Sequence, residues 1–157
     1  MQIITAIDQS LPLENNIELF LAGGISNCPD WQSDVIQEFK EESNLTMYNP
    51  RRSNFKITDS ESAKQIEWEF KRMKRSKIIC FWFSRGSVNP IVLYELGKMI
   101  DKRNKILVIG IDPKYERILD VRIQVQLTKR KIEISYGLDN FKKQIKDTLY
   151  NLKQNLI

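Results

Sequence analysis

Short apolar runs alternate with amphipathic stretches along most of the chain. Runs short enough to be buried strands occur at residues 1–7, 17–22, 45–48, 77–83 and 106–111. Between and after them, apolar residues recur at the three- and four-residue spacing of a helix, and these stretches are residues 29–43, 62–74, 92–101 and 140–156. Between residues 113 and 134 the pattern is irregular, and we expect a late strand at residues 123–127.

Strands that alternate with helices predict a mainly parallel sheet with helices on both faces. Right-handed crossover connections then give a doubly wound α/β fold. A chain of 157 residues can form one domain with its own core, and no repeat or linker divides it, so we predict a single domain over residues 1–157. The loops that follow the strands at 17–22, 45–48 and 77–83 should gather at one edge, where open α/β sheets bind ligands.

The composition excludes several kinds of catalytic site. The chain contains no histidine, which rules out Ser-His-Asp and Cys-His catalysis and argues against a zinc hydrolase. Acid–base and nucleophilic chemistry would therefore fall to Glu, Asp, Tyr, Lys or Cys. The two cysteines, Cys28 and Cys80, match no metal-binding spacing. We predict neither a metal nor a cofactor.

The charge pattern favours a small ligand over nucleic acid. The net charge is +5, but basic and acidic residues are interspersed, which does not favour a nucleic-acid surface and suits an anionic small molecule. No apolar run approaches the roughly 20 residues that cross a bilayer, and the first residues do not resemble a signal peptide. Sparse cysteine suits a reducing compartment. We therefore expect a cytoplasmic protein that does not act at a membrane.

Glu95 is the most informative residue of the chain. It would lie in the first turns of a helix that opens at the exit of the 77–83 strand, with Asn89 six residues before it. A carboxylate there, among apolar neighbours, is a candidate covalent nucleophile. A first-turn Glu also complements the helix dipole, and position alone favours this second interpretation. The other strand-end loops bear on the choice.

A pair of glycines opens the first of these loops. Gly23 and Gly24 would let backbone N–H groups approach a ligand closely, ahead of a helix N-terminus that attracts anions. A tight turn from strand to helix would use the same glycines. The pattern is neither a Walker loop nor a dinucleotide fingerprint, so these standard nucleotide sites are not predicted.

Charged side chains follow the next strand and occupy the helix after it. Arg51 and Arg52 can fork onto a phosphate or carboxylate, or form a solvated surface pair. Glu67 and Glu69, near the middle of the next predicted helix, are either exposed helix residues or partners of the Glu95 loop.

Taken in order, these segments resemble the nucleoside 2-deoxyribosyltransferase superfamily, and more specifically its deoxyribosyltransferase-like branch. The resemblance is carried by residues 20–25, 30–32, 49–52, 65–69 and 90–97. It covers about residues 17–112, and the last third of the chain matches little. It implies a flavodoxin-like sheet and cleavage of the N-glycosidic bond of a (deoxy)nucleoside or nucleotide.

The resemblance also implies a role for individual residues. Glu95, in the Glu-Leu-Gly motif, would be the nucleophile that forms a glycosyl-enzyme intermediate. Glu69 stands where other members have an Asp that handles the base, and Asn89 would contact the sugar or a phosphate. The implied substrate-binding set is completed by Phe20, Gly23, Gly24, Ile25, Ser26 and Arg51.

Three departures from the family pattern keep alternatives open. Phe20 stands where other members have a Tyr that orients the nucleophile, Glu69 is one methylene longer than Asp, and Asn89 cannot ionise. Transfer, hydrolysis and a nucleotide or modified nucleoside substrate therefore all stay open. A non-catalytic nucleotide-binding or sensing module of the same fold is the alternative function. Family subunits lend residues to each other's sites, which implies a homodimer or a larger homo-oligomer.

Overall fold

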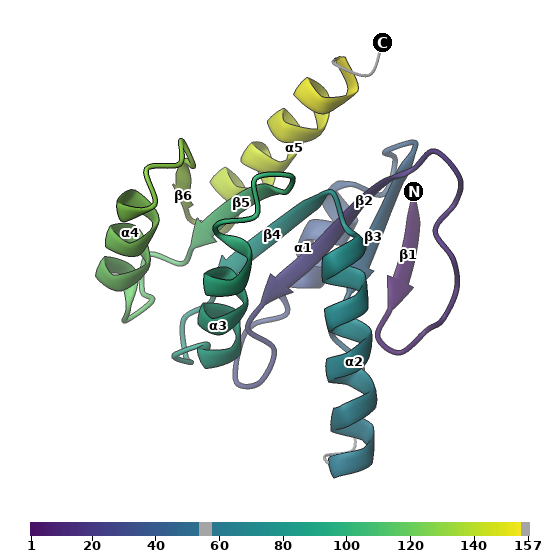
Figure 1. The fold of residues 1–157 in the computed structure, drawn as a ribbon, viewed down its shortest axis with the longest axis horizontal. Coiled ribbons are helices and arrows are strands. Elements are labelled where there is room, and N and C mark those ends of the chain that lie inside the picture. Colours follow the sequence, from purple (N-terminus) through teal and green to yellow (C-terminus); the bar gives the residue numbers. More distant parts are fainter. Residues whose placement is uncertain (54–57, 155–157) are drawn as a thin grey trace.

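A computed structural model describes residues 1–53 and 58–154. It shows a six-stranded, fully parallel sheet with five helices (Figure 1). The strands are β1 (Gln2–Thr5), β2 (Ile17–Gly23), β3 (Leu45–Asn49), β4 (Ile78–Phe83), β5 (Ile106–Ile111) and β6 (Ile134–Tyr136). The helices are α1 (Trp31–Glu38), α2 (Asp59–Arg75), α3 (Pro90–Met99), α4 (Ile118–Leu127) and α5 (Leu138–Gln154).

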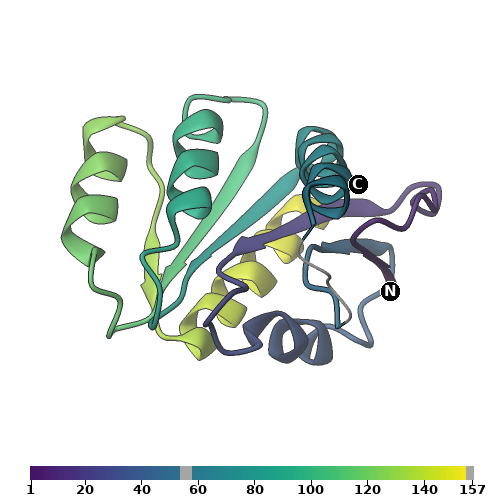
Figure 2. The ribbon, with the colours of Figure 1, turned by 90° about the horizontal axis from the view of Figure 1, so that it is seen from below.

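The strands lie in the order β1-β3-β2-β4-β5-β6. Helices α2, α3 and α4 cover one face of the sheet, and α1 and α5 cover the other (Figure 2). This arrangement confirms the predicted doubly wound α/β fold of the flavodoxin-like kind. None of the described helices is long and apolar enough to cross a membrane.

Two cores, one on each face of the sheet, explain why β4 is apolar at every position. Ile79, Phe81 and Phe83 join the core beneath α2, α3 and α4, whereas Ile78, Cys80 and Trp82 join the core beneath α1 and α5. Successive side chains of a strand point to opposite faces, so a strand covered on both sides needs an unbroken apolar run. The continuous apolar run in the sequence therefore predicted β4 correctly.

The predicted late strand at residues 123–127 is wrong, because this segment belongs to helix α4. Only Val121 and Val125 are buried on that helix, one turn apart, while Leu119, Ile123 and Leu127 are exposed. Apolar residues on the solvent face hide the helical stripe from the sequence pattern, and β-branched residues mimic a strand. The last strand is β6, at Ile134–Tyr136.

Helix α1 ends at Glu38, five residues before the end predicted for it. The backbone N–H of Glu42 donates to the carbonyl of Phe39, which closes a turn at 2.9 Å. Glu41 and Glu42 would otherwise lie against the negative end of the helix dipole, so continuing the helix through them is disfavoured. Asp30 caps the other end, where its side chain accepts from the N–H of Ser33.

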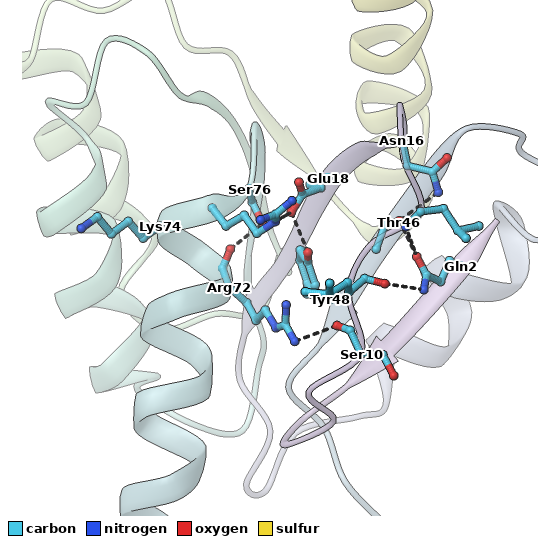
Figure 3. Close-up of polar contacts among 12 residues, drawn as sticks. Gln2, Ser10, Asn16, Glu18, Thr46, Tyr48, Arg72, Lys74 and Ser76 are labelled. Carbon is cyan, nitrogen blue, oxygen red and sulfur yellow. Dashed lines mark hydrogen bonds and ion pairs between the residues drawn. The ribbon is translucent and has the colours of Figure 1, made fainter.

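A partly buried polar network fixes α2 against β2 and β3 (Figure 3). The Tyr48 hydroxyl donates to Glu18 at 2.6 Å, and Glu18 also accepts from Arg75 at 2.6 Å. Arg72 stacks over the Tyr48 ring at 5.1 Å and donates to the Ser10 carbonyl at 2.9 Å. Burial, reinforced by Glu18, raises the pKa of Tyr48 to about 12. The network sets the position of the helix that carries Glu69.

Candidate active site

A cavity of about 390 Å³ opens at the carboxyl-terminal edge of the sheet, between the ends of β2 and β4. The chain leaves these neighbouring strands in opposite directions, since β2 leads to β3 on one side and β4 leads to β5 on the other. This is the switch point where open α/β sheets bind ligands. The lining residues are Phe20, Ala22, Gly23, Gly24, Ile25, Ser26, Asn27, Pro50, Glu69, Ser87, Asn89, Pro90, Ile91, Val92 and Glu95.

The three strand-end loops meet at this edge, as the pattern predicted. Of the catalytic and substrate-binding residues that the resemblance implied, all line the cavity except Arg51. They are Phe20, Gly23, Gly24, Ile25, Ser26, Glu69, Asn89 and Glu95. Arg52 and Glu67, which the sequence also left open, do not line it. Residues separated by up to 75 positions in the chain therefore share one cavity (95 − 20 = 75).

Two carboxyl groups from different helices line the cavity and interact electrostatically. Glu95 lies in the second turn of α3 and Glu69 in the middle of α2, and both are half-buried. Burial, and then the negative charge of Glu69, raise the pKa of Glu95 to about 8, against the opposing charge of Lys98. Burial also raises the pKa of Glu69, while a hydrogen bond from Gln65 and the charge of Arg52 oppose that shift.

Asn89 is occupied mainly with its own loop. It caps α3 with a left-handed backbone, at φ 52°. Its Nδ2 donates to the carbonyls of Ser84 and Ser87, each at 2.7 Å. The Cys28 thiol lies 3.6 Å from Oδ1 and donates to it. Both N–H donors of the amide are thus used inside the protein, so any bond to a ligand falls to Oδ1.

The two glycines of the first loop allow neighbouring side chains to pack against it. A Cβ on Gly24 would clash with Asn89 Oδ1 and lie 2.5 Å from the Cys28 sulfur, and one on Gly23 would clash with the Trp31 ring. Neither glycine has a positive φ, so close packing, not backbone conformation, requires them. The packing of the cavity walls therefore requires the glycines, in addition to any role they have in binding a ligand.

We expect Gly24→Ala to lower the free energy of unfolding by about 1–3 kcal/mol, the usual effect of overpacking. Asn89 cannot turn away cheaply, because two hydrogen bonds hold its amide. Gly97→Ala is the matched control: no atom lies within 4 Å of its added Cβ, and Ala should stabilise this helix by about 0.5–1 kcal/mol. Urea unfolding of the two variants measures both effects, and equal values would contradict the packing argument.

Arg51 ties the first loop to the end of β3. Its guanidinium donates to Gln32 at 2.9 Å and to the carbonyls of Ile25, Cys28 and Pro29, and it forms an ion pair with Asp30 at 3.1 Å. These bonds shape the loop whose residues line the cavity. Arg51 is therefore neither at the cavity nor in a solvated arginine pair.

Phe20 forms part of the apolar wall. Its side chain is almost fully buried and packs on the Trp68 ring, with 6.2 Å between ring centroids. Sequence reasoning missed other lining residues, among them Pro50, Ser87, Ile91 and Val92. It also missed the contact of Gln65 with Glu69, which their four-residue spacing on one helix could have suggested.

No group of three or more His, Cys, Asp or Glu side chains within residues 1–53 and 58–154 is arranged to hold a metal ion. The cavity chemistry rests on the two carboxyl groups, on hydroxyl and backbone groups, and on apolar walls. Such a set suits a neutral or weakly polar ring system held beside an acid–base pair.

Comparison with known proteins agrees with this geometry. The chain matches the model of the family described as nucleoside 2-deoxyribosyltransferase like over residues 16–115. The match runs from β2 to just beyond β5 and includes every residue that lines the cavity. No curated protein matches the sequence at a significant level. The chain therefore belongs to the nucleoside 2-deoxyribosyltransferase-like family.

Proposed function

We propose that the protein cleaves or transfers the N-glycosidic bond of a (deoxy)nucleoside or nucleotide through a covalent glycosyl intermediate on Glu95. The observation that carries this proposal is the meeting of Glu95 and Glu69, from two helices, in one cavity at the switch point of the sheet. Family membership supports nucleoside-type substrates. We place the reaction in the cytoplasm.

Each proposed step balances with these two side chains alone. The Glu95 carboxylate attacks C1′ of the sugar, the C1′–N bond breaks, and its electron pair leaves with the base, which takes a proton from the Glu69 carboxyl. An acceptor base or water then attacks C1′ and gives a proton to Glu69, while the bond from C1′ to Glu95 breaks. An acceptor base gives transfer, and water gives hydrolysis.

The cavity walls suit such a substrate. Phe20, Ile91 and Val92 offer apolar surface for the base and the sugar ring, and Ser26 and Ser87 offer hydroxyl groups. Ligand sites generally combine apolar walls with a few placed polar groups. Gly23, Gly24 and Ile25 would cradle the sugar or its 5′ end, and Oδ1 of Asn89 would accept from a sugar hydroxyl.

The decisive experiment is a substrate panel. The protein is incubated with nucleosides, deoxynucleosides and their monophosphates, with and without an acceptor base, and released or exchanged base is measured by chromatography. We expect base release that disappears in Glu95→Ala. Dependence on the acceptor distinguishes transfer from hydrolysis, and full activity of Glu95→Ala would contradict the covalent mechanism.

Two features favour a second candidate function, a non-catalytic nucleotide-binding or sensing module. Phe20 has no hydroxyl group to orient Glu95, and the N–H donors of Asn89 are used within its own loop. This alternative predicts saturable ligand binding and no base release from any member of the panel, even after long incubation. Thermal stabilisation by a nucleotide without release would support it.

We also propose that the protein forms a homodimer or a larger homo-oligomer. Helices α2 and α3 expose four large apolar side chains, of which Ile91 lines the cavity: Ile66, Phe70, Ile91 and Tyr94. The Lys98 ammonium lies 5.0 Å from the ring centroids of both Phe70 and Tyr94. Exposed apolar patches mark interaction sites. Sedimentation equilibrium tests the assembly, and a monomer at micromolar concentration would contradict it.

A further inference from the structure

We propose that Gln65 is a positioning residue, which holds one oxygen of Glu69 as a hydrogen-bond acceptor and thereby directs the carboxyl proton of Glu69 to its other oxygen. The inference rests on the proposed function, because it assigns the oxygen from which Glu69 would protonate the departing base. It concerns a side chain outside the cavity lining that touches a residue inside it.

Gln65 stands one helical turn before Glu69 on α2 and uses its whole amide group. Its Nε2 donates to Glu69 Oε1 at 2.8 Å and to the Pro50 carbonyl at 3.0 Å. Its Oε1 accepts from Arg52 Nε at 2.9 Å. The amide therefore links α2 to the loop after β3, and Pro50 of that loop lines the same cavity.

The chemistry of its neighbours fixes which way the amide of Gln65 points. A guanidinium can only donate hydrogen bonds, so the amide oxygen must face Arg52. A backbone carbonyl can only accept, so the NH₂ group must face Pro50. The same NH₂ group then faces Oε1 of Glu69. The orientation of a Gln amide is generally inferred from such a network. Here the constraints from Arg52 and from the Pro50 carbonyl agree.

This orientation restricts where Glu69 can carry a proton. An N–H donor already points at Oε1, and the oxygen without the proton is the better acceptor of a carboxyl group, so a proton on Oε1 would weaken this bond. Among residues 1–53 and 58–154, none donates a hydrogen bond to Oε2. Protonation of Glu69 is therefore favoured on Oε2, with Oε1 still bound to Gln65.

The charges around the pair agree with this role. Glu69 faces the carboxyl of Glu95 on α3 and the guanidinium of Arg52 in the loop after β3. Glu95 faces Glu69 and, on its own helix, Lys98. The bond from Gln65 and the charge of Arg52 both favour the ionised form of Glu69 and counteract the rise of its pKa by burial. The hydrogen bond from Gln65 thus helps Glu69 to release its proton.

The hydrogen bond from Gln65 matters because the side chain of Glu69 is flexible. A general acid works only when its proton lies within hydrogen-bond reach of the leaving atom, and each free rotation lowers the fraction of time spent there. Glu has one more rotatable bond than Asp, the shorter carboxylic acid. The hydrogen bond from Gln65 removes freedom that the extra methylene adds.

The test replaces Gln65 by a side chain of similar length that cannot donate. In Gln65→Met we expect kcat for base release to fall about 10- to 100-fold, the range for losing a hydrogen bond to a charged group, with KM within about threefold. Gln65→Glu keeps an acceptor for Arg52 but loses the donor, and should lose activity similarly. Gln37→Met, on the exposed face of α1, is the matched control and should retain full activity.

A second measurement does not depend on turnover. Interacting carboxyl groups titrate as a pair, so the Glu69 carboxyl is followed by ¹³C NMR in Glu95→Gln, with and without Gln65→Met. Loss of the donor should raise the pKa of Glu69. The same titration is made in Gln65→Leu, which introduces neither a donor nor a charge, if Gln65→Met does not fold.

The outcomes separate the two proposals. An unchanged Glu69 titration overturns the inference, even if kcat falls, because Gln65 would then be only structural. An enzyme whose kcat is unaffected by Gln65→Met also overturns it, while base release that depends on Glu95 leaves the proposed function standing. No base release by the wild type overturns the proposed function, and the titration still decides whether Gln65 controls Glu69.

Discussion

Glu95→Gln should abolish base release and at the same time make the protein more stable in neutral and alkaline solution. A carboxamide has the shape of the carboxyl group but cannot attack C1′ as an anion. Loss of a covalent nucleophile costs several orders of magnitude in turnover, so we expect a fall of at least about a thousandfold. A residue that only caps the helix dipole would change turnover little.

The expected gain in stability follows from the raised pKa of Glu95. The unfolded chain ionises this carboxyl near its ordinary value of 4.5, whereas the folded protein keeps the proton to about pH 8. Between these values the unfolded state holds fewer protons than the native state, so the free energy of unfolding falls as pH rises. The full gap of about 3.5 pH units corresponds to at most roughly 5 kcal/mol. Gln does not ionise and avoids this loss.

Urea unfolding at several pH values measures this effect. Wild type and Glu95→Gln should have similar stability near pH 4, and the variant should become progressively more stable up to about pH 8, with a constant difference above it. Glu67→Gln is the matched control, because Glu67 lies on the exposed face of α2 and pairs only with Lys71 among the described residues. A pH-independent difference for Glu95→Gln would show that Glu95 is not protonated in the folded protein.

Residues whose position depends on local pattern were predictable, and those that depend on distant partners were not. The strand at Ile106–Ile111 has the predicted bounds, because a run buried on both faces has to be apolar throughout. Glu95 fell in the predicted place, because a strand followed by Asn-Pro sets the start of the next helix. In contrast, the partners of Arg51 are carbonyls 22 to 26 positions earlier, and no local pattern reveals them.

The contrast between Glu69 and Glu67 makes the same point. Both are acidic residues near the middle of α2, two positions apart, and the residue pattern alone left both open as exposed helix residues. Two residues along a helix are about 200° apart, so burying one face exposes the other. Glu69 lies at the cavity, where burial raises its pKa, and Glu67 lies in solvent with Lys71. The pattern of the sequence could not separate them, the family resemblance pointed to Glu69, and the packing of α2 on the sheet places Glu69 and not Glu67 at the cavity.

Glu69→Gln should slow base release by about 10²- to 10⁴-fold, the usual contribution of a general acid, and should change its pH dependence. In the proposed mechanism the active form holds one proton on the pair, with Glu95 ionised and Glu69 protonated. This is the minor arrangement of the singly protonated pair, because the folded protein otherwise keeps the proton on Glu95 to about pH 8. We therefore expect kcat/KM to fall above about pH 8, where the pair loses this last proton. Without the negative charge of Glu69 the pKa of Glu95 should fall, and this alkaline loss should disappear.

A substrate whose base leaves without a proton separates acid catalysis from mere disruption of the site. N7-methylated deoxyguanosine carries a positive charge on its base, so cleavage releases a neutral base and needs no acid. Glu69→Gln should cleave this substrate within about tenfold of the wild-type rate, whereas Glu95→Gln should remain inactive, because the attack on C1′ is still required. If Glu69→Gln lost the same factor in rate on the methylated and unmethylated substrates, Glu69 would orient the base without protonating it. The two carboxyl groups would then line one site, but Glu69 would not act as the general acid.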